Sequence, residues 1–483
     1  MIHGLRAGDR LHVLGVAGTA MASLAGLLTR LGYRVSGSDQ GAYPPMSTVL
    51  EREGIEVRTP FGPGNLPGDC RAVIVGNAIS RGNPELEAAL DRRLPLVSFP
   101  ETLRELVLRR RVPVVVAGTH GKTTTTSLLA WILRTSGLDA GFLVGGVATD
   151  LGGSFALGAA GQPFVVEGDE YDSAYWDKGP KFLHYLPEVA VIGNVEFDHA
   201  DIYSDFAAVR RQFSFLARLP PRRGLLLLGA DSPAAAELAE AAHTTVRTFS
   251  VAGGEGPAAD WVAAIQPSGP SGSRLRATFR GEVRRSLHGR FWGRAAARNV
   301  LAAAAAAEWL GVEWEAVREA VRDFSGVERR LQQLAASPDG RVLVVRDFAH
   351  HPTAVEAVLE AGAQRWPGAR LVAVFEPRSF TARSAVFQDR FAGAFRKADQ
   401  VLLASPAGES RGRRLPGTAS LDLDRLASDL GSAGIPADVL TDHPAVLATV
   451  EQLARGDRGT VFLFLSNGHF GGLPEQAATL VQE

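Results

Sequence analysis

The sequence predicts an α/β protein made of three consecutive domains, residues 1–108, 109–325 and 326–483. The chain has 483 residues, which is enough for about three domains at roughly 150 residues each. Hydrophobic residues make up 46% of the chain and charged residues 21%, as in globular proteins, which excludes a disordered chain or a coiled coil. Strand-like runs alternate with helical patterns in all three segments, and this alternation predicts parallel sheets.

In the first domain, a strand at residues 10–16 leads into a turn with Gly15 and Gly18, and then into an apolar helix that ends near residue 31. A second strand, residues 33–36, is followed by a Gly-Ser-Asp sequence. A helix N-terminus after such a glycine turn binds phosphate groups. The third glycine of the dinucleotide-binding pattern is absent, so the turn favours a nucleotide diphosphate over NAD. Further strands are expected at residues 72–75 and 94–97.

The central domain opens with a strand at residues 112–117, which runs into Gly-Thr-His-Gly-Lys-Thr-Thr (residues 118–124) and a helix at residues 125–135. Backbone N–H groups at such a turn form an anion site. Lys122 would neutralise phosphate charge, and Thr123 would offer its hydroxyl to Mg²⁺. Val116 stands where the generic phosphate loop has its first glycine. Other expected elements are strands at 164–167, 189–193 and 224–228, a loop or hairpin edge at 253–273 and a helix at 295–310.

Two acidic segments each follow a predicted strand of the central domain. They are Glu-Gly-Asp-Glu-Tyr-Asp at residues 167–172 and Asn-Val-Glu-Phe-Asp-His-Ala-Asp at residues 194–201. Clustered carboxylates repel one another unless cations hold them, and Mg²⁺ ligands belong at strand ends beside a phosphate turn. We therefore expect the two segments to converge on one metal–phosphate site. For the first segment alone, a solvated acidic loop is the alternative interpretation.

The third domain is predicted from another alternation of strands and helices. It also contains Gly-Val-Glu-Arg-Arg at residues 326–330 and Asp-Phe-Ala-His-His-Pro at residues 347–352. An arginine there would stabilise charge on a transferring phosphoryl group, and Asp347 would accept hydrogen bonds from ribose hydroxyls. The histidine pair is compatible with either a structural or a functional role. Expected are strands at 341–346, 371–375, 400–404 and 460–465, helices at 353–365, 387–398, 421–432 and 443–454, and a loop at 405–418.

Charge and cysteine content narrow the classes of partner. The 51 Lys+Arg residues balance 52 Asp+Glu residues, and the net charge of −1 gives no electrostatic reason to expect nucleic acid or an anionic membrane as a partner. The single cysteine, Cys70, excludes an internal disulfide, which fits a cytoplasmic location. Residues 11–28 are apolar, but their glycines and polar side chains fit a strand, turn and helix better than a signal peptide.

Lysine is rare in this chain. Four of the 51 Lys+Arg residues are lysines, and three of them, Lys122, Lys178 and Lys181, lie close together in the sequence. Lysine carries a compact charge on a flexible stem, whereas arginine presents a planar fork. A position that has kept lysine is therefore a candidate for a site that needs the compact ammonium group.

A phosphate turn, two acidic segments and two flanking nucleotide-type domains together resemble the Mur ligase family of peptidoglycan synthesis, over nearly the whole chain. The resemblance implies a Rossmann-like domain for a UDP-sugar, a central ATPase domain and a Rossmann-like third domain that closes over ATP and binds the incoming peptide. Residues 118–124 look like the family's ATP loop. Residues 15–21 and 37–39 match the UDP-sugar turn of the branch that acts on UDP-N-acetylmuramate.

Two kinds of ligase in that branch compete. One attaches L-alanine in de novo synthesis, and the other attaches the tripeptide L-alanyl-γ-D-glutamyl-meso-diaminopimelate in peptidoglycan recycling. Six dispersed segments look like the tripeptide-attaching kind: residues 43–47, 170–182, 196–202, 347–353, 375–379 and 466–468. A GTPase-like switch, a dehydrogenase and a non-catalytic UDP-sugar-binding protein fit less well, because each leaves one of the motifs without a purpose.

The resemblance also implies a mechanism and a set of site residues. ATP phosphorylates the muramyl carboxylate to an acyl phosphate, which the α-amine of the incoming peptide then attacks. The implied catalytic residues are Lys122, Glu170, His199, Arg330 and His350. The implied ATP site is Gly118, Thr119, His120, Gly121, Lys122, Thr123, Thr124, Asn299, Arg329 and Asp347, with Thr123, Glu170 and His199 as Mg²⁺ ligands. The implied UDP-sugar residues are Gly15, Gly18, Thr19, Ser38 and Asp39, and the implied peptide-binding residues are Arg378, Ser379 and Thr381.

The sequence departs from the family in three places, of which Gly168, where the tripeptide-attaching ligases usually have Ala, is a small change. Ala295 and Ala296 stand where the family usually has His-Asn, which puts one nucleotide contact in doubt. Residues 182–396 contain no lysine, so the carbamylated lysine of several relatives cannot form there.

Overall fold

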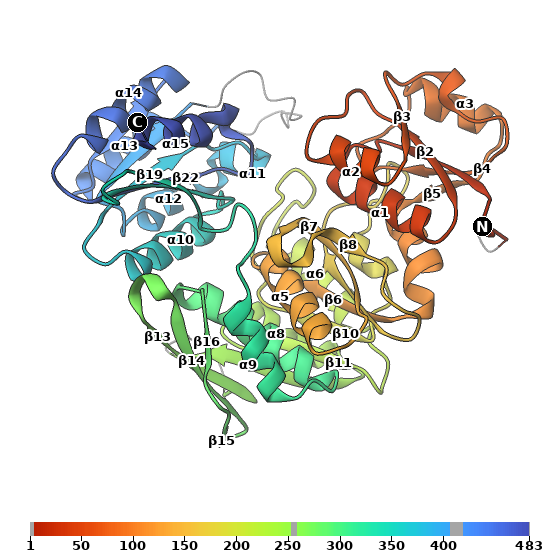
Figure 1. The fold of residues 1–483 in the computed structure, drawn as a ribbon, viewed down its shortest axis with the longest axis horizontal. Coiled ribbons are helices and arrows are strands. Elements are labelled where there is room, and N and C mark those ends of the chain that lie inside the picture. Colours follow the sequence, from red (N-terminus) through yellow and green to blue (C-terminus); the bar gives the residue numbers. More distant parts are fainter. Residues whose placement is uncertain (1–3, 253–257, 406–418, 483) are drawn as a thin grey trace.

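The computed structural model describes residues 4–252, 258–405 and 419–482. Within these ranges the strands form three separate sheets of five, eleven and six strands, which follow one another along the chain (Figure 1). The prediction of three successive α/β units is therefore confirmed. The exact domain boundaries at residues 108 and 325 stay predictions.

The first sheet has the strand order β3-β2-β1-β4-β5, and all of its pairings are parallel, as the alternating pattern predicted. Its apolar strands are covered by helices, and α1 buries eight of its twelve residues. The strands are β1 (Arg10–Leu14), β2 (Arg34–Ser38), β3 (Glu56–Arg58), β4 (Cys70–Val75) and β5 (Leu96–Ser98). The α-helices are α1 (Thr19–Arg30), α2 (Met46–Arg52), α3 (Pro84–Asp91) and α4 (Phe99–Thr102).

The central sheet runs β15-β14-β13-β12-β11-β10-β6-β9-β7-β8, with β16 paired to β14. Its middle strands β10, β6 and β9 are parallel neighbours, so the segments that follow them leave the sheet at the same edge. Those three segments are the phosphate turn and the two acidic segments. The strands are β6 (Val112–Ala117), β7 (Gly141–Ala148), β8 (Gly153–Ala156), β9 (Pro163–Gly168), β10 (Val189–Ile192), β11 (Leu225–Gly229), β12 (Thr245–Val251), β13 (Trp261–Pro267), β14 (Ser273–Phe279), β15 (Glu282–Val283) and β16 (Leu287–Gly289).

Helices α5 and α8 pack against each other beside this sheet and bring the phosphate turn close to the start of α8 (Figure 1). The alanine-rich sequence of α8 buries its residues from Val300 to Ala307, because small side chains let two helices approach closely. The α-helices of this unit are α5 (Lys122–Thr135), α6 (Phe206–Ala217), α7 (Pro233–Ala236), α8 (Gly293–Trp309) and α9 (Trp314–Asp323).

The third sheet has the order β17-β18-β22-β19-β20-β21, and only the edge pair β17–β18 is antiparallel. Strand β22 is fully buried, as its sequence Thr-Val-Phe-Leu-Phe-Leu requires. The strands are β17 (Gln332–Ala336), β18 (Val342–Asp347), β19 (Arg370–Phe375), β20 (Gln400–Ala404), β21 (Ala437–Leu440) and β22 (Thr460–Leu465). The α-helices are α10 (Pro352–Arg365), α11 (Phe380–Arg383), α12 (Gln388–Ala394), α13 (Leu423–Ser432), α14 (His443–Ala454) and α15 (Leu473–Gln482).

The hairpin β7–β8, at one end of the central sheet, contacts both the first and the third unit. Toward the first unit, the Ser154 hydroxyl lies 3.0 Å from that of Ser23 on α1, and the Arg30 guanidinium lies 4.6 Å from the centre of the Phe155 ring. Toward the third unit, the Glu328 N–H donates to the Val147 carbonyl at 3.0 Å. One hairpin thus ties all three units together.

Some expected elements differ from the structure. The helix expected at residues 387–398 ends at Ala394, because the chain leaves helical geometry at Phe395. Residues 253–273 contain the start of an antiparallel hairpin, β13–β14, which confirms the hairpin-edge alternative. Most of the loop expected at 405–418 lies outside the described residues. In the described part of the chain, no helix is both long and apolar enough to cross a bilayer.

Candidate active site

The phosphate turn after β6 is fixed by the neighbouring strand end. The Asn194 side chain accepts from the His120 N–H at 2.8 Å and donates to the His120 carbonyl at 3.1 Å. Gly118 has a φ of +129°, and a Cβ there would lie 2.9 Å from the Asn194 carbonyl oxygen, so only glycine fits. These contacts hold the turn in shape and leave Lys122 at the start of α5.

The Lys122 side chain contacts the carboxylate of Glu170. The ammonium lies 3.0 and 2.8 Å from the two oxygens, and His199 Nε2 lies 3.1 Å from one of them. Burial opposes ionisation of Glu170, but Lys122 and His199 outweigh it and lower its pKa to about 2. Burial alone would lower the pKa of His199, but the carboxylates of Glu170 and Asp198 together outweigh burial and raise it. His199 itself has a φ of 55°, a conformation that non-glycine residues adopt mainly where a site requires it.

A second carboxylate, Glu167, lies beside Thr123. Its Oε2 accepts from the Thr123 hydroxyl at 3.0 Å and its Oε1 accepts from the Gly145 N–H at 2.6 Å. Burial, together with the nearby charge of Asp169, raises the pKa of Glu167 to about 7. Thr123 is thus paired with Glu167, while Glu170 is paired with Lys122 and His199. The donor set of two carboxylates, a hydroxyl and an imidazole suits a divalent cation.

The third unit reaches this site through Arg330. Its Nη2 lies 3.4 Å from the Thr123 hydroxyl, whereas the Arg329 guanidinium turns away and donates to the carbonyls of Ser466 and Gly468. Of the two arginines, the structure brings only Arg330 to the phosphate turn. Both guanidinium groups nevertheless contact the Phe348 ring, whose centre lies 5.0 Å from the guanidinium carbon of Arg329 and 4.9 Å from that of Arg330.

Asp347 is the last residue of strand β18 in the same unit, and His350 follows this strand. The two oxygens of Asp347 accept N–H groups of Leu331 and Ala349 at 2.6 and 2.8 Å, so this buried carboxylate already organises its own backbone. His350 Nδ1 lies 3.0 Å from the Phe348 carbonyl oxygen. Burial lowers the pKa of His350, which leaves its imidazole neutral at pH 7.

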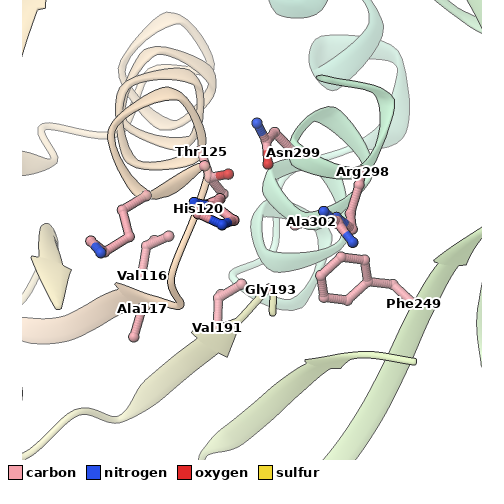
Figure 2. A pocket seen from close by; sticks show the side chains of 12 residues that line it. Val116, Ala117, His120, Thr125, Val191, Gly193, Phe249, Arg298, Asn299 and Ala302 are labelled. Atoms are coloured by element: carbon pink, nitrogen blue, oxygen red, sulfur yellow. The ribbon is translucent and has the colours of Figure 1, made fainter. Parts of the chain in front are cut away.

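A pocket beside the turn contains Asn299, as expected for a nucleotide base. The amide packs so tightly on Gly121 that a Cβ there would lie 2.3 Å from Asn299 Oδ1. Arg298 lines the same pocket beside Phe249 (Figure 2), and its Nη1 lies 3.4 Å from Asp231. The pocket is lined by Val116, Ala117, His120, Gly121, Lys122, Thr125, Val191, Gly193, Phe249, Arg298, Asn299 and Ala302.

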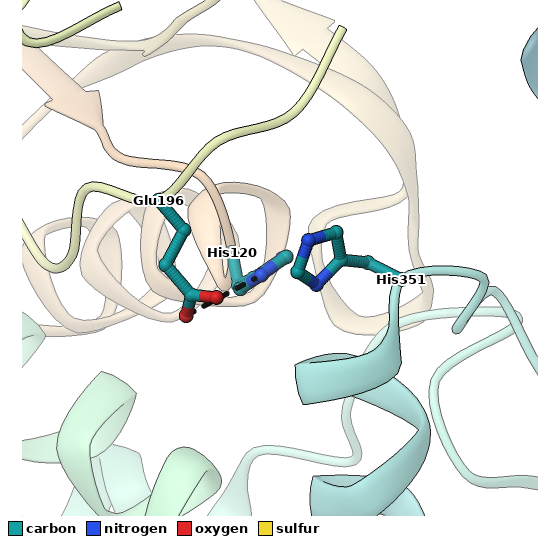
Figure 3. A group of neighbouring side chains, drawn as sticks. All are labelled: His120, Glu196 and His351. Carbon is teal, nitrogen blue, oxygen red and sulfur yellow. Dashed lines mark ion pairs between the residues drawn. The ribbon is translucent and has the colours of Figure 1, made fainter. Parts of the chain in front are cut away.

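His120, Glu196 and His351 form a cluster between the central and third units (Figure 3). Their possible ligand atoms lie within 4.8 Å of one another, and His120 Nε2 lies 3.8 Å from a Glu196 oxygen. Both ring nitrogens of His351 are engaged, however, since Nε2 lies 3.2 Å from the Phe197 carbonyl oxygen and Nδ1 accepts from the Thr353 N–H at 3.3 Å. The arrangement brings side chains of the central and third units into contact, with both ring nitrogens of His351 already bonded within the protein.

The predicted UDP-sugar turn lies between β1 and α1. Gly15 has a φ of +79°, and the Ala17 N–H donates to Asp39 Oδ2 at 2.9 Å, so Asp39 shapes the turn. Thr19 is exposed at the first position of α1, where it is accessible to a ligand. The Ser38 hydroxyl is fully buried and donates to Glu85 at 2.7 Å, so this side chain supports the sheet instead of lining the turn.

The predicted peptide-binding residues have three different environments. Arg378 is exposed. Ser379 caps helix α11 by accepting from the Ala382 N–H at 3.1 Å. Thr381 is buried, and its hydroxyl accepts from the Ala200 N–H of the central unit at 3.3 Å. Of the three, only the Arg378 side chain is placed to meet a ligand.

Sequence reasoning missed two side chains of this site. Glu167 and Asn194 were recognised only as members of acidic segments, although one pairs with Thr123 and the other fixes the phosphate turn. Both stand at or directly after the end of a strand next to β6. The neighbouring order of β10, β6 and β9 was the missing information, because it decides which strand-end residue faces the turn.

Comparison with known proteins adds to this geometry. Three family models match in succession: "Mur ligase family, catalytic domain" over residues 10–111, "Mur ligase middle domain" over residues 116–307 and "Mur ligase, glutamate ligase domain" over residues 329–468. They follow the three sheets in order.

Individual relatives align over nearly the full chain. A UDP-N-acetylmuramate–L-alanyl-γ-D-glutamyl-meso-2,6-diaminoheptandioate ligase of Haemophilus influenzae is 36% identical, covering 96% of this chain and 98% of the relative. A UDP-N-acetylmuramate–L-alanine ligase of Halorhodospira halophila is 38% identical, covering 97% and 92%. The crystal structure of a murein peptide ligase from Psychrobacter arcticus is 33% identical and superposes with a TM-score of 0.70, covering 98% of this chain and 99% of that one.

Proposed function

Because the chain belongs to the Mur ligase family, whose members are ATP-dependent ligases that form amide bonds, we propose that it joins UDP-N-acetylmuramate to L-alanyl-γ-D-glutamyl-meso-diaminopimelate. The observation that carries this proposal is the convergence of Lys122, Glu170 and His199 at the phosphate turn, with Arg330 arriving from the third unit. Phosphoryl transfer depends chiefly on such charge neutralisation and positioning.

In the proposed reaction, the muramyl carboxylate attacks the γ-phosphorus of ATP and ADP leaves. The peptide α-amine then attacks the acyl phosphate, and inorganic phosphate leaves as the amide forms. Lys122 is drawn from Glu170 toward the phosphate oxygens, and the turn N–H groups bind them. Arg330 stabilises the charge that develops on the transferred group. The neutral imidazole of His350 is suited to accept a proton from the peptide α-ammonium, which leaves the free amine that attacks.

Mg²⁺ is the proposed metal. Thr123, Glu170 and His199 would hold it, and the position of Glu167 next to the Thr123 hydroxyl adds a fourth donor. Bound there, Mg²⁺ would neutralise phosphate charge during transfer. Both carboxylates must be ionised to bind it and His199 must be neutral, so binding releases the protons that these groups hold.

The substrates would bind on either side of the phosphate turn. The glycine turn with Gly15, Gly18 and Thr19, shaped by Asp39, is proposed to bind the UDP diphosphate at the N-terminus of α1. Asn299 is proposed to contact adenine, with Arg298 as an additional donor where Ala296 offers none. Arg378 is proposed to meet a carboxylate of the incoming peptide. The third domain would close over ATP, and the reaction would take place in the cytoplasm, where ATP and UDP-sugars are made.

Attachment of L-alanine is the alternative, supported by the 38% identity to a ligase of that kind. The tripeptide is favoured because segments such as residues 170–182 and 196–202 resemble the tripeptide-attaching ligases. In addition, the alignment covers 98% of the Haemophilus influenzae relative, against 92% of the Halorhodospira halophila relative. The deciding experiment measures ADP release with ATP, Mg²⁺ and UDP-N-acetylmuramate, adding either the tripeptide or L-alanine. A kcat/KM for the tripeptide at least about 100-fold above that for L-alanine is expected, a ratio set by about 2.7 kcal/mol of differential binding. A preference for L-alanine would select the alternative.

A further inference from the structure

Lys181 is a buried lysine to which the proposed function assigns no role. Its side chain is 11% exposed, and its ammonium lies 3.8 Å from Asp169 in the first acidic segment. The ammonium also lies 5.9 Å from the centre of the Phe99 ring and 5.7 Å from the centre of the Tyr171 ring. A cation between two aromatic rings is attracted to both, more strongly where water is excluded.

The two rings belong to different parts of the fold. Phe99 directly follows β5, the edge strand of the first sheet, and is buried. Tyr171 belongs to the acidic segment after β9, and its ring centre lies 4.3 Å from that of His199. Lys181 thus connects the first sheet to the side chain that lies on His199.

Tyr171 is only partly covered by the rest of the protein. The residue is 37% exposed. The Lys181 N–H donates to the Tyr171 carbonyl at 3.1 Å, so the backbone brings the two residues together, while the ammonium contacts the ring. His199 meets Tyr171 on one side and Glu170 on the other, at 3.1 Å.

We propose that Lys181 is a positioning residue for the metal site: clamped between Phe99 and Asp169, it holds the Tyr171 ring against His199 and so orients the His199–Glu170 pair. This deepens the proposed function, since it takes these two residues as metal ligands. The position of the compact ammonium, 5.9 and 5.7 Å from the two ring centres, is our explanation for a lysine in a chain that mostly uses arginine. Residues that orient metal ligands contribute about 10- to 100-fold to metal affinity.

The chain offers a matched control. Lys178 lies in the same loop and pairs with Asp172 at 2.6 Å, but its side chain is 67% exposed and contacts neither ring. The test compares Lys181→Met, which keeps the apolar stem, with Lys181→Arg, which keeps the charge, and with Lys178→Met. Mn²⁺ binding in the presence of ADP is measured by electron paramagnetic resonance, and the Mg²⁺ concentration for half-maximal ligation is measured beside it.

Lys181→Met is expected to weaken Mn²⁺ binding about 10-fold and to raise the half-maximal Mg²⁺ concentration similarly. Lys181→Arg should recover part of this loss, and Lys178→Met should stay within about twofold of the parent. Tyr171→Leu should weaken Mn²⁺ binding in the same way, because Lys181 acts through the Tyr171 ring. The double variant with Lys181→Met should bind Mn²⁺ little more weakly than either single variant. Unchanged Mn²⁺ affinity in folded Lys181→Met or Tyr171→Leu would overturn the proposal. Mn²⁺ binding needs no peptide or UDP-sugar, so this result stands apart from the identity of the substrates.

Discussion

The Nζ of Lys122 donates to Oε2 of Glu170 at 2.8 Å, so the cation of the phosphate turn is paired with a carboxylate of the acidic segment. Burial opposes the charge on Lys122, but Glu170 and Asp169 outweigh it and raise the pKa of Lys122 above its ordinary value. The ammonium is therefore charged and held in place before a nucleotide arrives. When a nucleotide binds, its phosphate oxygens replace Glu170 as the partner of the Lys122 ammonium. Lys122 is already ordered and shielded from water, so the entropic cost of binding is lower than for a mobile lysine.

Lys122→Ala should lower kcat for ATP-dependent ligation at least about 100-fold, because one charged donor to the transferring group is lost. Binding of UDP-N-acetylmuramate, measured by calorimetry, should stay within about twofold, since the turn after β1 is untouched. Lys178→Ala, at an exposed lysine, is the control and should retain full turnover. Normal turnover by Lys122→Ala would remove this residue from the mechanism.

Glu167 should make the stability of the protein depend on pH. Its pKa is about 7 in the folded chain against an ordinary value of 4.5, so the folded state favours the protonated form. The stabilisation is complete below about pH 4.5 and is lost as the pH rises through 7. Without Mg²⁺, the melting temperature should therefore fall between pH 5 and 8 less steeply for Glu167→Gln than for the parent. Mg²⁺ at pH 8 should raise the parent's melting temperature more than that of the variant.

The exposed Glu51 provides the matched substitution, because Glu51→Gln changes the same functional group outside the site. It should keep the parent's pH slope. Identical slopes for all three proteins would show that Glu167 titrates normally.

Arg329 and Arg330 should differ in what they affect. Arg330→Ala removes the donor beside Thr123 and should lower kcat about 100-fold with an unchanged melting temperature. Arg329→Ala leaves the carbonyls of Ser466 and Gly468 without their charged donor and should destabilise the protein by about 1–3 kcal/mol. Steady-state kinetics and urea unfolding on both variants separate the two roles. The reverse pattern would exchange the assignments.

Thr353 should hold the third unit against the central one. Its hydroxyl donates to Glu196 at 2.7 Å, and Arg390 of the third unit lies 3.5 Å from the same carboxylate. Thr353→Val should weaken the contact by about 1–3 kcal/mol, because a bond to a charged acceptor is lost. The expected result is a larger radius of gyration in small-angle scattering.

Thr449→Val is the comparison for that experiment, since among the described residues the Thr449 hydroxyl donates to the Ala445 carbonyl of its own helix α14. Its scattering should match that of the parent. If Thr353→Val is as compact as the parent, other contacts must hold the third unit in place.

The parts of this protein that are local in sequence could be predicted. Strand β6 has the predicted bounds, because a β-branched run before a glycine turn has few other conformations. The Lys122 turn was recognisable for the same reason. The side chains that pair with Thr123 and His120 could not be predicted. Glu167 and Asn194 lie beside them because β9 and β10 are the sheet neighbours of β6, and the sequence does not give this order. Ser38 shows the reverse: its turn motif suggested a ligand, but packing directs its hydroxyl to Glu85.

The hairpin β7–β8, which contacts all three units, also limits where the chain could act as a hinge between the central and third units. Its Ala148 pairs with Val327, and the next residue, Glu328, is bonded to Val147, so the chain is anchored to the central sheet up to that point. Arg329 and Leu331 follow with φ values of 60° and 44°, and β17 of the third sheet begins at Gln332. If the third unit rotated relative to the central unit, the rotation would occur at these few residues. Arg330 lies within this short segment, so such a rotation would leave it beside Thr123, while Arg378, in the loop after β19, would move with the third unit.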